Sequence, residues 1–247
     1  MSGKRILVTG AGKGVGREVS IALAKAGCKV YALSRTQSTL DSRVQEYPDI
    51  IPITQDLNNW EETRAKLQQI EPLDGLVNNA AVCSLMSCLE ETEHQLEHYM
   101  RNNTFSAINC TQVVAKKMIE AGKEGSIINI TSIADKQAFP LLMGYSISKA
   151  ALAQATRSFA LELGKYNIRV NTVAIAGIMT EMSRKAEEDS GIRMFEVVRE
   201  RIPMGRLLSL EDTVGPILYL LSDASAMVTG TDHTVDGGLF CNITTKQ

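Results

Sequence analysis

Residues 5–16 read Arg-Ile-Leu-Val-Thr-Gly-Ala-Gly-Lys-Gly-Val-Gly, a short apolar run that leads into a glycine-rich loop. Such a run is typical of a buried parallel strand. Residues 17–26 then show a helical pattern, which Gly27 stops. A strand, a glycine loop and a helix in that order let a backbone approach a phosphate closely, with a helix N-terminus pointing at it. The stretch therefore predicts a nucleotide site. The alternative is a turn that only lets the helix pack on the sheet.

The loop departs from the strict G-x-G-x-x-G pattern, because Val15 stands where the third glycine would fall. The pattern present is Thr9-Gly10-x-x-x-Gly14-x-Gly16. We expect the following loop residues to contact the nucleotide: Gly10, Lys13, Gly14, Val15 and Gly16.

Strand-like and helix-like stretches alternate along the rest of the chain. The strand-like stretches are 5–9, 29–33, 51–54, 74–80, 126–132, 169–174 and 233–238. Helical stretches are expected at 17–26, 38–46, 60–70, 93–121, 145–165 and 211–221. This alternation predicts a single-domain α/β protein, residues 1–247, with a Rossmann-type doubly wound parallel sheet and helices on both faces. The long polar segment 176–206 is the expected substrate lid.

Composition excludes several functional classes. The net charge is −2, so nothing indicates a nucleic-acid or membrane footprint. No apolar run reaches the eighteen or so residues that span a bilayer. The five cysteines have no metal-like spacing, and residues 1–5 lead directly into a strand rather than a signal peptide. We expect a cytoplasmic protein with reduced thiols.

The end of the second strand bears on the cofactor. A carboxylate about twenty residues past the loop would hold a ribose 2′-hydroxyl and repel a 2′-phosphate. That place holds Ser34, Arg35 and Thr36, with no acid. Arg35 and Lys13 can both pair with a phosphate, although both could be ordinary surface charges. The sequence therefore favours NADP(H). Residues at the next strand ends are assigned to the adenine (Asp56, Leu57) and to its ribose and the floor beneath it (Asn79, Ala80, Ala81).

Tyr145 and Lys149 are four residues apart, which places both side chains on one face of a helix. The pKa of a free tyrosine is about 10, too high for acid–base work near neutrality. A cation held beside the phenol would lower that pKa. The pair is therefore a candidate acid–base catalyst, although tyrosine and lysine also occur at this spacing by chance.

These motifs, together with Asn78-Asn79-Ala80, Ser132 and Asp236-Gly237-Gly238, resemble those of the short-chain dehydrogenase/reductase family over nearly the whole chain. Within the family the resemblance is greatest to the dicarbonyl/L-xylulose reductases. It implies an NADPH-dependent homotetramer, and we expect residues 93–121 and 145–165 to form one of its interfaces. It also implies that a hydride passes from the nicotinamide to a substrate carbonyl.

The resemblance also implies roles for single residues. Tyr145 would donate the proton, Ser132 would orient the carbonyl oxygen, and Lys149 would lower the Tyr145 pKa and hold the nicotinamide ribose. Asn103 would anchor a water that relays protons to Lys149. Thr180 and Ile178 would lie beside the nicotinamide carboxamide.

The expected substrate wall is apolar, consisting of Ile133, Phe139, Leu141, Leu142 and Met143, with Ser132 and Tyr145 as the polar contacts. The implied substrate is a ketose (L-xylulose to xylitol) or an α-dicarbonyl, and burial of unpaired polar groups makes an apolar carbonyl at least as good a fit as a sugar. Alternatives are an NADP-dependent 3-oxoacyl or hydroxysteroid reductase, and a non-catalytic NADP-binding protein.

Residues 94–98 match the H-x-x-E-H pattern of some zinc enzymes. A catalytic zinc needs a third ligand and an open pocket, and nothing nearby supplies them. We therefore expect no metal.

Overall fold

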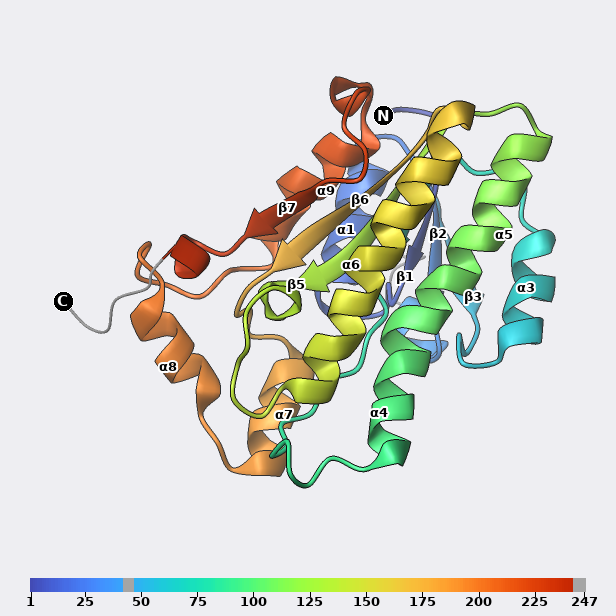
Figure 1. Cartoon of the computed structure of the whole chain (residues 1–247). Coiled ribbons are helices and arrows are strands. Elements are labelled where there is room, and N and C mark those ends of the chain that lie inside the picture. The colour runs from blue at the N-terminus through green and yellow to red at the C-terminus, as the bar shows by residue number, and fades with distance from the viewer. Residues whose placement is uncertain (42–46, 242–247) are drawn as a thin grey trace.

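The computed structural model describes residues 1–41 and 47–241. Its centre is a seven-stranded parallel sheet with the order β3-β2-β1-β4-β5-β6-β7 (Figure 1). The strands are β1 (Arg5–Thr9), β2 (Lys29–Ser34), β3 (Ile50–Thr54), β4 (Gly75–Asn78), β5 (Gly125–Ser132), β6 (Ile168–Ile175) and β7 (Asp232–Val235). The chain builds outward from β1 in one direction and then, from β4, in the other. The predicted single-domain, doubly wound Rossmann-type sheet is confirmed.

Helices cover both faces of the sheet. The α-helices are α1 (Gly14–Lys25), α3 (Trp60–Gln68), α4 (Glu93–Tyr99), α5 (Ser106–Glu120), α6 (Met143–Leu163), α7 (Glu181–Ser190), α8 (Met194–Arg201) and α9 (Val214–Leu221). α1 and α9 pack on one face, and α5 and α6 on the other, with α3 beside α5 (Figure 1).

Strand β1 is apolar on both of its faces because helices cover both faces of the sheet. Ile6 and Val8 point into the cluster under α1 and α9, whereas Leu7 between them points into the cluster under α5 and α6. All three side chains are fully buried. The continuous apolar run that predicted a parallel strand thus fills two cores at once.

The predicted single helix over residues 93–121 is interrupted. α4 begins with a capping box between Thr92 and Gln95. A π-helical turn, η1 (Met100–Phe105), then separates α4 from α5. A π-turn is a rare insertion in a helix and is common at functional sites. The expectation of one regular helix is therefore wrong at this turn, which carries Asn103.

The expected lid segment contains two helices. The Thr180 hydroxyl caps the start of α7, and Gly191, with a φ of +70°, follows its last residue, Ser190. α8 follows, and both helices lie beyond the carboxyl ends of β5 and β6 (Figure 1).

Two further expectations concern helices. Residues 38–41 are helical, and residues 42–46 of that predicted helix lie outside the described part of the chain. Within the described residues, no helix combines the length and the apolar character needed to cross a bilayer.

Candidate active site

A cavity of about 660 Å³ lies at the carboxyl ends of the strands, at the switch in strand order. Most residues assigned from the sequence line it: Gly10, Lys13, Gly14, Val15, Ser34, Arg35, Thr36, Asp56, Leu57, Asn79, Ala80, Ala81, Ser132, Ile133, Leu142, Tyr145, Lys149, Ile178 and Thr180. Gly16 and Asn103 do not line it.

One end of the cavity suits a phosphate. The first turn of α1 has no acidic residue, and no side chain caps its backbone N–H groups. These groups are therefore available to an anion. A Cβ at Gly14 would meet only the Thr180 side chain, at 3.6 Å, so the space above the loop is open. The backbone φ of +53° at Gly14 favours glycine there.

Gly16 acts through packing. A Cβ at this position would collide with Asn79 Nδ2 and with the backbone of Gly10. Asn79 Nδ2 in turn donates hydrogen bonds to the carbonyls of Thr9 (3.1 Å) and Gly10 (3.3 Å). The Asn79 amide thus ties the glycine loop to the end of β4, and Gly16 leaves room for it.

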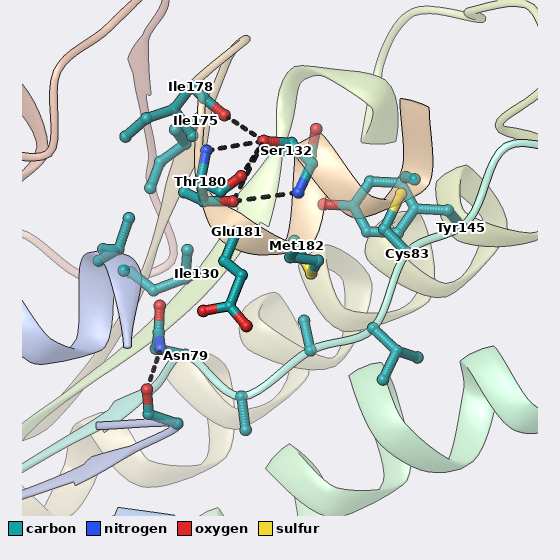
Figure 2. Close-up of a pocket in the computed structure, with 18 of the residues that line it drawn as sticks. Asn79, Cys83, Ile130, Ser132, Tyr145, Ile175, Ile178, Thr180, Glu181 and Met182 are labelled. Carbon is teal, nitrogen blue, oxygen red and sulfur yellow. Dashed lines mark hydrogen bonds between the residues drawn. The ribbon is translucent and has the colours of Figure 1, made fainter. Parts of the chain in front are cut away.

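The second strand carries the predicted cation and no carboxylate. Arg35 is exposed and lines the cavity, and it has no ion-pair partner among the described residues. Lys13 Nζ contacts Glu181 Oε1 at 2.6 Å, which joins the glycine loop to the start of α7. The Glu181 side chain reaches into the cavity (Figure 2). A ligand phosphate at this end would meet Arg35 directly and would compete with Glu181 for Lys13.

Lys149 lies deep in the catalytic end. It is 2 % exposed, and its Nζ donates a hydrogen bond of 2.8 Å to the Ile130 carbonyl. Nζ is 5.8 Å from the centre of the Tyr145 ring. Burial lowers the pKa of Lys149 to about 8, while Cys83 and Asp135 oppose this shift. The amine therefore titrates close to neutral pH.

Tyr145 behaves differently from the expectation. Burial raises its pKa, Cys83 and Asp135 raise it further, and only the Ser132 hydroxyl acts in the opposite direction. The Cys83 sulfur lies beside the Tyr145 ring (Figure 2). The protein groups alone therefore do not produce the predicted lowering of the Tyr145 pKa by Lys149. They keep the phenol protonated at neutral pH, which is the state of a proton donor.

Asn103 supports the catalytic helix from the π-turn. Its Nδ2 donates to the Val82 carbonyl (3.0 Å) and to Ser148 Oγ (2.9 Å), and its Oδ1 accepts from Val82 N (2.8 Å). Ser148 Oγ also donates to the Tyr145 carbonyl at 2.7 Å. Both amide hydrogens of Asn103 are thus committed to the protein. The neighbouring Asn102 bonds instead to His98 and Asn58.

The substrate end of the cavity is apolar, and sequence reasoning missed part of it. Ile133, Phe139 and Leu142 line it as expected, but Leu141 and Met143 do not. Leu141 packs against the cluster of Leu85, Leu142 and Ala186 without lining the cavity itself, and Met143, the first residue of α6, is 36 % exposed. Lining residues that were not predicted include Cys83, Leu85, Ala134 and Leu239. The predicted lid segment 176–206 contributes further apolar lining residues, Met182, Ala186, Met194, Phe195 and Val198, and also the charged Lys185 and Asp189. Cys83 lies shortly after the end of β4, and this position at a strand end was the one sequence feature that could have predicted its place in the cavity lining.

His94 and His98 lie one turn apart on α4. Within the described residues no group of three or more His, Cys, Asp or Glu side chains has an arrangement that could hold a metal ion.

Comparison with known proteins adds independent information. Residues 10–240 match the protein family described as Enoyl-(Acyl carrier protein) reductase. The chain is 43 % identical to D-erythrulose reductase of Gallus gallus over 236 residues, which are 96 % of this chain and 95 % of that protein. It is 42 % identical to L-xylulose reductase of Mus musculus over 238 residues, 96 % of this chain and 97 % of that protein.

A solved structure shares the fold closely. It is a gluconate 5-dehydrogenase from Burkholderia cenocepacia J2315 in complex with NADP and tartrate, and it superposes with a TM-score of 0.91 at 27 % sequence identity. The match covers 98 % of this chain and 97 % of the other.

Proposed function

This chain belongs to the short-chain dehydrogenase/reductase family, and we propose that it is an NADPH-dependent reductase of a ketose or α-dicarbonyl carbonyl group. One observation supports the proposal most. Ser132 at the end of β5 and Tyr145 and Lys149 at the start of α6 line the same cavity as the glycine loop and Arg35. Proton donor, oxygen-orienting hydroxyl and phosphate-binding groups are thereby brought to one site.

The cofactor fits the residues present. Gly10, Gly14 and the N-terminus of α1 would hold the pyrophosphate, and Arg35 with Lys13 would hold the 2′-phosphate. Bound NADPH supplies a hydride to the carbonyl carbon. The relatives support this cofactor, because the gluconate 5-dehydrogenase of similar fold binds NADP.

The chain's own groups carry the proton chemistry. Tyr145 donates its phenolic proton to the carbonyl oxygen, and the Ser132 hydroxyl orients that oxygen by a hydrogen bond. Lys149 holds positive charge beside the phenolate that forms. Asn103 holds the turn of α6 between Tyr145 and Lys149 through Ser148. Thr180 and Ile178 bound the nicotinamide end, and the helices of residues 176–206 cover the substrate.

The apolar lining sustains a second candidate, an NADP-dependent 3-oxoacyl or hydroxysteroid reductase. A substrate panel with purified protein separates the two. It contains L-xylulose, diacetyl, an acetoacetyl thioester and a steroid ketone, and the loss of NADPH absorbance is followed, then that of NADH. We expect turnover of the sugar and of diacetyl with a strong preference for NADPH. Turnover of the bulky ketones alone would move the proposal to the second candidate.

A matched pair of variants tests the catalytic assignment. Tyr145→Phe removes only the hydroxyl at the site, and we expect it to lower kcat by about 10²–10⁴-fold while NADPH still binds. Tyr166→Phe makes the same change at a 41 % exposed tyrosine and is expected to keep full activity. Binding of NADPH without turnover of any panel substrate by the wild type would favour a non-catalytic NADP-binding protein.

We further propose a cytoplasmic homotetramer in which α5 and α6 form one interface. The π-turn that leads into α5 exposes Phe105 at 45 %, and α6 exposes Ile147 at 50 % and Leu161 at 86 %. Large apolar side chains left exposed on neighbouring elements are consistent with an interaction surface. Light scattering tests the assembly, and a monomer mass would refute it. All five cysteines are free thiols, as a reducing compartment favours.

A further inference from the structure

Asp135 is a carboxylate in an unusual place. It lies three residues after Ser132, at the end of the 3-10 turn η2 (Ile133–Asp135) that packs against α6 (Figure 1). Both of its carboxylate oxygens are inaccessible to solvent and lack a well-formed hydrogen bond within the described residues, and the nearby Thr131 hydroxyl lowers the Asp135 pKa by hydrogen bonding. A buried carboxylate with so little hydrogen bonding is costly, so its position calls for a role.

The sheet beneath the turn is polar on the face that α6 covers. Thr131 of β5 is paired with Ala174 of β6, and Ala174 with Thr234 of β7, so these three residues form one row across the sheet. Asp232 lies on the same face of β7. The Thr131 hydroxyl, which acts on Asp135, and Asp232 Oδ1 are likewise buried and lack a well-formed hydrogen bond within the described residues. Asp135 is therefore part of a cluster of buried polar groups with few hydrogen bonds.

The charged and titratable groups around Asp135 come from three elements. Asp232 on β7 repels it, while its sequence neighbour Lys136 and Lys149 on α6 attract it. Lys136 is itself held by Asp232 Oδ2 at 2.5 Å and by Thr234 Oγ1 at 2.9 Å. Lys136 is thereby drawn toward β7. The charge of Asp135 acts in turn on two residues of the proposed catalytic set, Lys149 and Tyr145. Cys83 also lies beside these two residues.

We propose that Asp135 is a positioning residue whose negative charge keeps Lys149 and Tyr145 in their protonated forms and so sets the alkaline limit of carbonyl reduction. This inference rests on the proposed function, because it assumes that Tyr145 donates the proton. Asp135 touches neither the cavity nor the substrate, since it is absent from the cavity lining. It acts through the electrostatic field at Lys149 and Tyr145.

The sign of the effect follows from the individual shifts. Burial, and then the charge of Asp232, raise the pKa of Asp135 to about 6. Above that pH Asp135 is charged and raises the pKa of both Lys149 and Tyr145. Below it Asp135 is neutral and has no such influence. At low pH Lys149 and Tyr145 are protonated in both proteins, so wild type and a variant without the charge should agree there and diverge on the alkaline limb, where these two groups lose their protons.

The test compares Asp135→Asn with wild type in the pH dependence of kcat/KM, which reports the free enzyme. We expect the alkaline limb to move to lower pH by about one unit, equal to about a tenfold loss of kcat/KM on that side. The two profiles should converge on the acid side. Asp223→Asn makes the same change at an exposed aspartate paired with Lys4, and its profile should match wild type.

A measurement without substrate separates this inference from the proposed function. Lysine labelled with ¹³C at Cε is titrated by NMR, and the Lys149 signal is assigned from its absence in Lys149→Arg. Asp135→Asn should lower the Lys149 pKa. A lowered pKa in a protein that turns over no carbonyl would sustain the electrostatic role while the proposed function fails. An unchanged Lys149 pKa would overturn the inference whatever the activity.

Asp232→Asn provides a second variant if Asp135→Asn does not fold. In the same NMR titration the Lys149 ¹³Cε signal should sense the charging of Asp135 near pH 6 in the wild type. Removing the Asp232 charge lowers the pKa of Asp135, so this inflection should move to lower pH in Asp232→Asn. An inflection at the wild-type pH, or none in either protein, would contradict the influence of Asp135 on Lys149.

Discussion

Two serines of α6 lie two residues apart and differ in their hydrogen bonds, with Ser148 fully buried and Ser146 partly buried. Ser148 Oγ accepts from Asn103 Nδ2 and donates to the Tyr145 carbonyl. Ser146 Oγ is buried and has no partner among the described residues. Replacing each serine by alanine therefore tests whether the link between the π-turn and α6 stabilises the protein.

The expected cost of Ser148→Ala follows from what it leaves behind. One amide hydrogen of Asn103, which is 1 % exposed, loses its acceptor. A buried donor without a partner costs about 1–3 kcal/mol. Alanine regains roughly 0.5 kcal/mol through its higher helix propensity, so we expect a net loss of about 1–2 kcal/mol. For a chain of this size that lowers Tm by about 2–8 °C.

Ser146→Ala should act in the opposite direction. It removes a buried hydroxyl that has no partner and gains the same helix propensity, so we expect unchanged or slightly raised stability, by roughly 0.5–1 kcal/mol. Calorimetry and urea unfolding with an unchanged m-value measure both variants. A Tm loss for Ser146→Ala as large as that for Ser148→Ala would refute the hydrogen-bond argument. Coupling of Ser148→Ala with Asn103→Ala in a double-mutant cycle localises the effect to this pair.

Two other predictions concern charges at the surface. Arg35→Ala should weaken NADPH binding by about 10–100-fold and leave NADH binding unchanged, because it removes one charge-assisted phosphate contact of about 1.5–3 kcal/mol. Fluorescence titration measures both affinities, with Arg193→Ala as the control. An equal loss of affinity for both cofactors would contradict the phosphate-binding role of Arg35. Lys29, Tyr31 and Arg5 hydrogen-bond to Glu71 and lower its pKa to about 2. The stability advantage of wild type over Glu71→Gln should therefore be constant above about pH 5 and vanish as the pH falls toward 2. Urea unfolding from pH 2 to 7 measures this difference in the free energy of unfolding. A difference that does not change with pH would contradict the role of the Glu71 charge.

The sequence was sufficient to predict the architecture because glycine and polar residues mark the ends of the apolar runs that form the strands. The run of residues 5–9 is apolar at every position, which indicates burial on both faces, and the glycines after it set the turn. The spacing of Tyr145 and Lys149 likewise requires only that α6 be a helix. Local rules suffice for such features, and the predicted helix and strand boundaries at these places are close to those observed.

Features set by tertiary contacts escaped sequence reasoning. The π-turn at Met100–Phe105 has no local signature, since hydrogen bonds from Asn103 and Thr104 to α6 stabilise it. The pKa of Tyr145 depends on burial and on Cys83, which is distant in sequence. Leu141 and Met143 were predicted to line the cavity because they are apolar and adjacent in sequence to Leu142, which does line it. Asp135 carried one weak signal, a charge directly after a buried strand.

The π-turn has a consequence for the number of residues in this part of the chain. Each residue of an α-helix turns the chain by about 100°, and a π-turn absorbs one extra residue in that count. Deleting a single residue between Met100 and Phe105 would remove that extra residue, so α4 and α5 could join as one regular helix with their amphipathic faces still aligned. The turn that places Asn103 against Val82 and Ser148 would be lost with it. The number of residues in this turn therefore determines where Asn103 lies relative to α6. One-residue insertions and deletions in the turn should be far less tolerated than substitutions at its exposed positions.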